Sequence, residues 1–272
     1  MELLQLFRGS SESRAEHLAA LRPVVLMGRG HSGTRVLAWM CAHLGLQLGS
    51  SAPHVTGDPD DVKFTDRIKG IAARNLDITS PYDASARAMR KFRSAVAAYW
   101  RGLGQPMDMW GWKFPETYLI APIVARAFPQ ARYLHLVRDG RDLAFKRHLT
   151  DNTERRVGRA VLAACGATTL PHHLQAASSW AYQVDRFDAF KTQLATSSVF
   201  EVRFEDLCTA PRHWAERLCE FLGVPMTDEC RRYTETGIDA QKIAQYLEEY
   251  LRQCSELEQR IAPTLRRYRY MA

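Results

Sequence analysis

The sequence feature that most constrains the fold is an unbroken run from Pro23 to Gly49, PVVLMGRGHSGTRVLAWMCAHLGLQLG. Its first part, Val24 to Met27, is entirely apolar, which is typical of a strand covered on both faces of a parallel sheet. A turn containing Gly28, Gly30 and Gly33 follows, and the apolar residues after it have the pattern of a buried helix. The order strand, glycine loop, helix predicts a phosphate site, because free N–H groups at a helix start attract anions.

Basic and hydroxyl side chains surround the expected start of this helix. Arg29, His31 and Arg35 are basic, and either Ser32 or Thr34 is expected to cap the helix. Because the glycines lack a Cβ atom, the backbone can take left-handed conformations and come close to a ligand. A glycine turn without any ligand is the alternative. The convergence of three basic residues on one helix start favours the anion site.

Comparison with the nucleotide-hydrolase pattern G-x-x-x-x-G-K-[ST] narrows the choice of anion. Gly28 and Gly33 have the required spacing, but Thr34 replaces the lysine and Arg35 replaces the hydroxyl residue that binds magnesium. The loop can therefore cradle phosphates but lacks the magnesium ligand.

The pattern G-x-x-x-S-G-T before an apolar helix resembles the 5′-phosphosulfate loop of sulfotransferases that use 3′-phosphoadenosine 5′-phosphosulfate (PAPS). The resemblance implies that the loop residues bind this donor, that the product is PAP, and that no metal is needed. These residues are Arg29, Gly30, His31, Ser32, Gly33, Thr34 and Arg35. Members usually carry Lys or Arg where this chain has His31. The cation beside the leaving phosphate is therefore His31, Arg29 or Arg35.

A second motif, LVRDGRDLAFKRH, follows the predicted strand 131–137. It resembles the family's 3′-phosphate motif, in which an Arg after the strand and a Ser eight residues later hold the phosphate. Arg138 matches the Arg, whereas Lys146 replaces the Ser. Lysine also binds phosphate, so both residues are expected to bind the donor. Alone, Arg and Asp after a strand more often form a solvated turn with a surface ion pair; the position of the motif at a strand end, after a phosphate loop, favours the phosphate site.

The sequence MWGWKFPE supplies a further cation. Its Lys113 resembles the Lys that family members place beside the transferred sulfate. The neighbouring Trp110, Trp112 and Phe114 indicate a buried strand end, where an unpaired ammonium is costly. A lysine that reaches solvent from a sheet edge is the alternative. We expect Lys113 to be catalytic together with His31.

The base that accepts the proton of the acceptor hydroxyl is less well specified. In one branch of the family a base follows soon after the first helix, and the segment 50–61 offers carboxylates and a histidine there. We predict Asp58, because Gly57 and Pro59 hold it in a turn, although such a residue is more often a plain turn residue. The alternatives left open are His54, Asp60, Asp61, Glu116 and His31.

Alternating strands and helices predict the fold class. We expect an α/β fold of three layers, with a central parallel sheet, a P-loop-like phosphate-binding loop and helices on both faces. Strands are expected at 24–27, 107–113, 131–137 and 199–204. Helices are expected from 34, at 60–75, 89–99, 121–128, 172–194, 214–222 and 243–261, and one beginning over 142–148. The segment 150–171 carries charge and glycine, so we expect a mobile lid there.

The resemblance covers residues 23 to 225 in separated blocks. Its last block, Val202 to Pro225, is similar to the strand and helix that close many sulfotransferase sheets. The segment after it is similar in character to that of bacterial members. No linker or repeat interrupts the chain, so a single domain over residues 1–272 is expected.

Composition limits the partners. The net charge of +7 favours anionic ligands but is spread along the sequence, so no nucleic-acid partner is expected. The amino-terminal residues do not form an apolar segment long enough for a membrane anchor. The six cysteines are widely spaced and are expected to be reduced, which favours a cytoplasmic protein. The sequence does not predict an oligomeric state.

Together these features predict transfer of a sulfuryl group from PAPS to an acceptor hydroxyl, on a carbohydrate or glycolipid. The acceptor partner is expected to be a small molecule or a glycan. Two other classes share part of the pattern: a nucleotide-dependent kinase or hydrolase, and a non-catalytic protein that binds polyanions.

Overall fold

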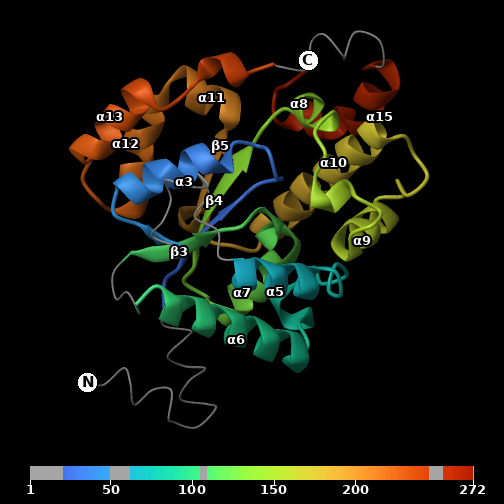
Figure 1. The fold of residues 1–272 in the computed structure, drawn as a ribbon, viewed down its shortest axis with the longest axis horizontal. Coiled ribbons are helices and arrows are strands. Elements are labelled where there is room, and N and C mark those ends of the chain that lie inside the picture. The colour runs from blue at the N-terminus through green and yellow to red at the C-terminus, as the bar shows by residue number, and fades with distance from the viewer. Residues whose placement is uncertain (1–20, 50–61, 105–108, 245–253, 272) are drawn as a thin grey trace.

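A computed structural model describes residues 21–49, 62–104, 109–244 and 254–271 (Figure 1). Five parallel strands form one sheet in the order β2-β3-β1-β4-β5. They are β1 (Val24–Met27), β2 (Gln47–Leu48), β3 (Trp110–Lys113), β4 (Arg132–Val137) and β5 (Val199–Arg203). The expected parallel sheet is therefore confirmed, and the carboxyl ends of its strands lie along one edge.

Helices cover both faces of the sheet, as a three-layer α/β fold requires (Figure 1). One face carries α3 (Thr34–His43), α11 (Phe204–Thr209), α12 (Pro211–Leu222) and α13 (Asp228–Thr236). The other carries α5 (Val62–Ala72), α6 (Ala86–Gly102), α7 (Ala121–Ala127), α8 (Gly140–Ala144), α9 (Arg156–Ala164), α10 (His172–Lys191) and α15 (Cys254–Arg267). In this part of the chain, none of the helices has the length and apolar character needed to cross a bilayer.

The central strand β1 explains why its sequence is apolar without interruption. Val24 and Leu26 point into the core beneath α3, whereas Val25 and Met27 point into the core on the opposite face. Side chains alternate between the two faces of a strand, so a strand covered on both sides needs apolar residues at every position. All four side chains are fully buried.

The start of α3 differs from the prediction of a hydroxyl cap. Gly33 is the N-cap, with φ 94° and ψ 14°, and no side chain caps the helix. Thr34 is already the first residue of the helix, and the Ser32 hydroxyl is buried without a hydrogen-bond partner among the described residues. The left-handed conformation of Gly33 turns the chain into the helix, so the prediction of a Ser or Thr cap was wrong.

The expected helix over 142–148 and the expected lid over 150–171 also need correction. The helix α8 begins earlier, at Gly140, and ends at Ala144. The supposed lid contains α9, whose Val157, Val161 and Leu162 are buried. These three residues form one helical face that packs into the core, and that spacing was the signal overlooked in the sequence.

A partly buried ion-pair network attaches the end of α15 to the sheet. On β4, His135 Nδ1 lies 2.7 Å from Glu201 Oε2 of β5. Lys191 Nζ lies 2.7 Å from Asp188 Oδ1 and 2.6 Å from Glu201 Oε2. The Tyr268 hydroxyl, just after α15, donates toward both carboxylates at 2.7 and 3.0 Å. His135, Asp188 and Glu201 have a spacing that could suit a metal ion, but two cations already pair with the carboxylates: Lys191 contacts both, and Arg267 Nη1 lies 2.7 Å from Asp188 Oδ2.

Hydrogen bonding controls the charge state within this network. Burial alone raises the pKa of a carboxyl group, but hydrogen bonds from His135 and Lys191 lower the pKa of Glu201 to about 2. Glu201 therefore remains ionised at its half-buried position, where it links β4, β5, α10 and the residue after α15.

Candidate active site

A cavity of about 500 Å³ opens where β1, β3 and β4 end. In open parallel sheets this edge is where ligands bind. The glycine loop and α3 form one wall, α5 and the segment after β3 form another, and Arg138 follows β4. The lining residues are Gly30, His31, Gly33, Thr34, Arg35, Val36, Thr65, Lys69, Lys113, Phe114, Pro115, Glu116, Arg138, His148, Leu149, Phe204 and Lys242.

The loop backbone depends on glycine for two different reasons. At Gly33 the reason is conformational, since its φ of 94° is a left-handed value. At Gly30 the reason is space, because a Cβ atom there would lie 2.0 Å from His148 Nε2. Of the three loop glycines, Gly28 and Gly30 are not left-handed, whereas Gly33 is. The other left-handed residue of the loop is His31, with φ 69°.

The Arg29 side chain points away from the cavity and is fully buried. Its Nη2 lies 2.8 Å from Asp151 Oδ1, and neither side chain is exposed to solvent. Its Nη1 donates to the Gly30 carbonyl at 3.0 Å, and its Nη2 also donates to the Lys146 carbonyl at 3.4 Å. This arrangement attaches the glycine loop to the segment after α8.

Of the remaining loop side chains, some line the cavity and one does not. His31 is exposed at the cavity, where its Nε2 donates to the Arg147 carbonyl at 3.0 Å. Thr34 and the exposed Arg35 also line the cavity, whereas Ser32 is buried outside it. Partial desolvation, with Arg29 nearby, lowers the pKa of His31 from its ordinary value of 6.5.

Arg138 lies at the cavity wall and is held firmly. Its Nε and Nη2 donate to Asp142 Oδ2 at 2.9 and 2.7 Å, and its Nη1 donates to the His31 carbonyl at 3.3 Å. The guanidinium also stacks on Phe204, 4.5 Å from the ring centre, and Nη2 donates to the Lys242 carbonyl. A guanidinium fixed in this way is preorganised to bind an anion.

Lys146, by contrast, is half-buried behind the cavity and is not among the residues that line it. Burial, and then the positive charge of Arg138, lowers the pKa of Lys146.

Three lysines add positive charge to the cavity. Lys113 ends β3, where it pairs with Leu26 of β1, and it is only 5% exposed. Lys69 enters from α5, and its ammonium lies 5.8 Å from the centre of the Phe114 ring. Lys242 lies beside Arg138. The lining therefore suits a ligand that carries several negative charges.

Glu116 is the one carboxylate among the described residues that line the cavity. It is 1% exposed, and its Oε1 lies 3.2 Å from His148 Nε2. On the other side of the ring, His148 Nδ1 accepts from the Thr150 backbone N–H at 3.4 Å. The ring therefore contacts Thr150 through Nδ1 and faces the Glu116 carboxylate with Nε2.

The His148 ring stays neutral in this environment. Burial, followed by the positive charges of Arg29, His31 and Lys69, holds the pKa of His148 well below 6.5. A neutral ring lies beside the Glu116 carboxylate without forming a strong ion pair with it.

The structure thus brings together most of the predicted site residues and adds others. Asp58, His54, Asp60 and Asp61 lie outside the described residues. The sequence analysis missed Lys69, His148, Lys242 and Phe204. A signal existed for Lys69 alone, since Thr65 and Lys69 are four residues apart and so lie on one face of a helix.

Comparison with known proteins identifies the family. A sequence model of the sulfotransferase family matches residues 23–228, which is more than half of the chain. The chain belongs to the sulfotransferase family. No curated protein matches the sequence well enough to count as a relative.

Solved sulfotransferase structures share the fold at low sequence identity. The sulfotransferase domain of the Synechococcus PCC 7002 olefin synthase is 16% identical, with a TM-score of 0.58, and the match covers 93% of this chain and 96% of that one. The sulfotransferase domain of the curacin biosynthetic pathway is 16% identical, with a TM-score of 0.55, and the match covers 90% of this chain and 98% of that one. A Mycobacterium avium sulfotransferase is 13% identical, with a TM-score of 0.53, and the match covers 93% of this chain and 78% of that one.

Proposed function

We propose that this sulfotransferase takes its sulfuryl group from PAPS and transfers it to an acceptor hydroxyl on a carbohydrate or glycolipid. The observation that carries the proposal is the cavity at the ends of β1, β3 and β4. The glycine loop, Lys113 and Arg138 meet there, with several further cations around them. PAPS carries phosphate at two separate positions, and two separate sets of donors are available for them.

The residues present fit this donor. The 5′-phosphosulfate is assigned to the glycine loop and the start of α3, where Gly30 keeps the loop free of a Cβ atom and Thr34 and Arg35 line the cavity. The 3′-phosphate is assigned to Arg138, whose guanidinium is oriented by Asp142 and Phe204. Lys146 is the second candidate for this phosphate, although it would have to turn toward the cavity.

The catalytic roles are assigned to side chains at the centre of the cavity. PAPS supplies the sulfuryl group when it is bound. Glu116 takes the proton of the acceptor hydroxyl as the acceptor oxygen bonds to sulfur, and His148 positions Glu116. Lys113, with His31 as a second cation, stabilises the charge that develops on the leaving phosphate. Asp58 remains the second candidate for the base.

Arg29 is assigned a different role from the one expected from its place in the loop. Its guanidinium is bonded to Asp151 and to two backbone carbonyls, so we propose that it fixes the loop and does not contact the donor. Ser32 likewise supports the loop through its backbone. Five cysteines whose side chains the structure describes are unpaired, which supports the proposed cytoplasmic location.

Thermal-shift titration separates this function from its two rivals. PAP should raise the melting temperature without magnesium, by an amount that grows with ligand concentration. A kinase or hydrolase would instead respond to ATP with magnesium. A non-catalytic polyanion binder would respond to neither nucleotide, and stabilisation by ATP and magnesium alone would refute the proposal.

A further inference from the structure

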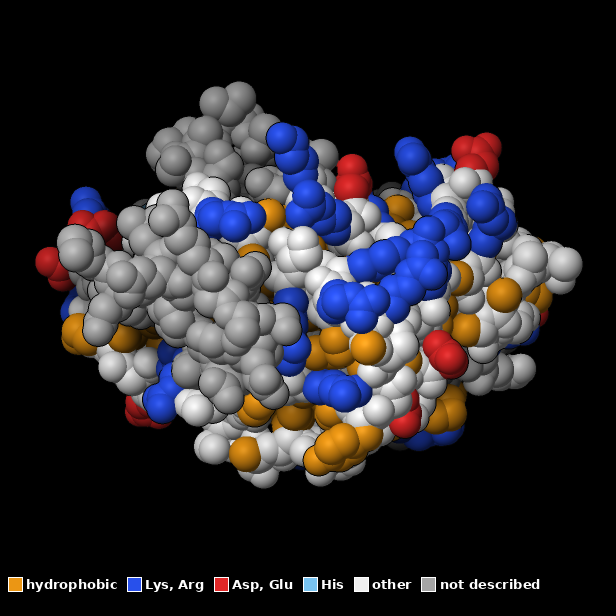
Figure 2. All heavy atoms as spheres, turned by 90° about the horizontal axis from the view of Figure 1, so that it is seen from below, with side chains coloured by type: hydrophobic (Ala, Val, Ile, Leu, Met, Phe, Trp, Pro, Cys, Tyr) orange, Lys and Arg blue, Asp and Glu red, His pale blue; other side chains and the backbone are white. Residues whose placement is uncertain are grey.

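A basic groove lies between α5 and α6, outside the catalytic cavity. Two adjoining hollows of about 430 and 250 Å³ form it, and both are lined by Gly70, Ile71, Arg74 and Lys91. Arg67, Arg87 and Arg90 complete the set of cations along its walls. Figure 2 shows a band of Lys and Arg side chains across this side of the molecule.

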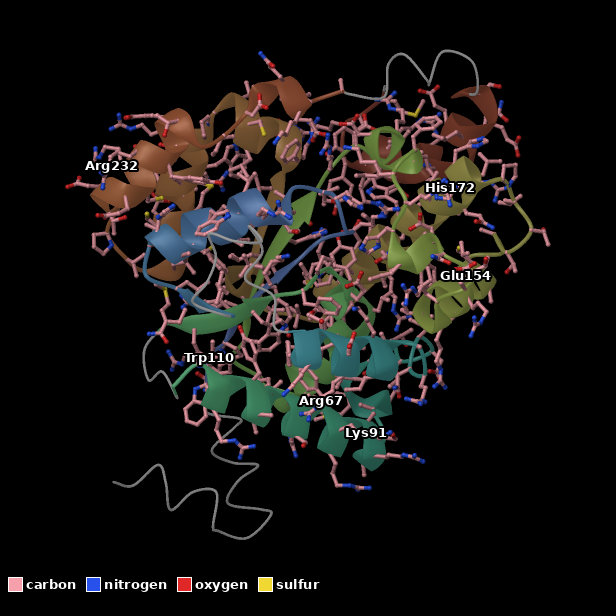
Figure 3. The ribbon with its side chains drawn as sticks, in the orientation of Figure 1. Arg67, Lys91, Trp110, Glu154, His172 and Arg232 are labelled. Carbon is pink, nitrogen blue, oxygen red and sulfur yellow. The ribbon has the colours of Figure 1, made fainter. Side chains whose placement is uncertain are left out.

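The two helices supply cations from opposite walls of the groove. Arg67 and Arg74 belong to α5 and the turn after it, whereas Arg87, Arg90 and Lys91 belong to α6. In Figure 3, Arg67 and Lys91 extend from these neighbouring helices. A ligand lying in the groove would therefore be contacted from two sides.

The positive charge of the groove is not balanced by neighbouring acids. Among the described residues that line it, none is Asp or Glu, and none of its five cations forms an ion pair there. The positive charge of Arg87, more than any other cause, lowers the pKa of Lys91, and Arg74 and Arg156 add to the effect. Such mutual repulsion is relieved when an anion binds.

The groove and the catalytic cavity share one helix. Thr65 and Lys69 line the cavity, whereas Arg67, Gly70 and Ile71 line the groove. The two sites are therefore separated by about one helix diameter, roughly 10–12 Å. An extended molecule in the groove can pass over α5 and reach the cavity.

We propose that the groove binds an anionic polysaccharide that bears sulfate or carboxylate groups, and that this chain carries the acceptor hydroxyl. The proposal rests on the proposed function and specifies its acceptor. Guanidinium groups recognise both kinds of anion through paired hydrogen bonds, and four of the five cations are arginine. The remaining lining residues are small or polar apart from Ile71, which suits a hydrated polymer.

The shape of the groove favours a polysaccharide over other polyanions. A bilayer surface is flat and cannot contact both walls of a concave groove. Single-stranded nucleic acid binds through aromatic side chains on which bases stack, and none of the described lining residues is aromatic. An acidic globular protein presents a convex surface, whereas a linear chain follows the groove.

The test uses the full chain without nucleotide and a triple variant, Arg87→Ala/Arg90→Ala/Lys91→Ala. These residues lie on α6, and alanine preserves helix propensity there. The probe is a fluorescently labelled chondroitin sulfate oligosaccharide, titrated at several salt concentrations. The variant should bind it about tenfold more weakly than wild type. The slope of log K against the logarithm of the salt concentration should be smaller in magnitude by about two to three.

A second triple variant, Arg212→Ala/Arg231→Ala/Arg232→Ala, is the matched control. It removes the same charge from α12 and α13, and Arg232 lies far from the groove (Figure 3). These arginines lie near acids, such as Glu216 at 3.2 Å from Arg212, whereas none of the described residues that line the groove is acidic. The control variant therefore has the same net charge as the groove variant but leaves the cations of the groove in place. The control should bind the probe like wild type.

The outcomes separate this proposal from the proposed function. Equal weakening in both triple variants, or none in either, would overturn the groove as the binding site. Groove-dependent binding of poly-glutamate, an oligonucleotide or anionic vesicles in preference to chondroitin sulfate would overturn the choice of polysaccharide. PAP titration of the same three proteins tests the donor site independently. PAP should bind all three with equal affinity, whether or not the variants bind the polysaccharide.

Discussion

Replacing Asp151 with asparagine should destabilise the protein strongly, because it leaves the Arg29 guanidinium buried without a counter-charge. Both side chains are fully buried and 2.8 Å apart. Breaking a buried ion pair from one side costs about 3–5 kcal/mol. For a chain of this size, that corresponds to a fall in melting temperature of roughly 6–10 °C. In Asp151 one carboxylate oxygen accepts from Arg29 and the other from the His148 backbone N–H, so the amide, with one acceptor oxygen, loses one of these hydrogen bonds as well as the charge.

Differential scanning calorimetry with a matched control tests this magnitude. Glu216→Gln removes a carboxylate that lies 3.2 Å from Arg212, but both side chains are more than half exposed. Exposed pairs contribute about 0–1 kcal/mol, so the control should lower the melting temperature by at most about 2 °C. If Asp151→Asn lowers it no more than the control does, the buried pair does not stabilise the loop as argued here.

The same pair decides the role of Arg29. The double variant Arg29→Met/Asp151→Leu removes both charges together, which should recover most of the lost stability. Isothermal titration with PAP then measures the donor site. Since Arg29 does not line the cavity, PAP affinity should fall less than in Arg138→Ala. A larger fall would make Arg29 a phosphate ligand.

Four further substitutions test the assigned roles. Arg138→Ala should weaken PAP binding by about 1.5–3 kcal/mol more than binding of adenosine 5′-phosphosulfate, which lacks the 3′-phosphate; equal weakening, by calorimetric titration, would remove the assignment. Glu116→Gln should lower kcat by about 10²–10⁴ while PAP affinity is unchanged, and a comparable loss in Asp58→Asn alone would transfer the role of base to Asp58. The lowered pKa of His31 means that its ring is neutral in the free protein near pH 7, so a bound dianion must raise that pKa for the ring to be charged. In pH–rate profiles wild type should therefore lose activity on the alkaline side earlier than His31→Lys, and identical alkaline limbs would show that the imidazole carries no catalytic charge.

Much of the fold could be predicted because the relevant signals are local. The apolar run at β1, the glycine loop and the alternation of strands with helices each lie within a short stretch of sequence. Lys113 and Arg138 could be placed in one site for the same reason, since each ends or follows a parallel strand. Strand ends in a parallel sheet meet at one edge whatever the loops do.

The remaining features depend on pairs of residues that are distant in sequence. Arg29 was expected to face a phosphate, but its partner Asp151 lies 122 residues later. The contact between Glu116 and His148 likewise joins the segment after β3 to the segment after α8. The net charge of the sequence also could not predict the groove, because its cations come together only when α5 packs on α6.

The network at the end of α15 also has a consequence for synthesis of the protein. Asp188 and Glu201 precede the Tyr268 hydroxyl that donates to them by 80 and 67 residues. A nascent chain on the ribosome therefore cannot complete the bonding around β5 until residue 268 has emerged. Until then Lys191 and His135 can pair with the two carboxylates, but α15 does not yet cover α10, a partly finished state that exposes the chain to misfolding and to chaperones.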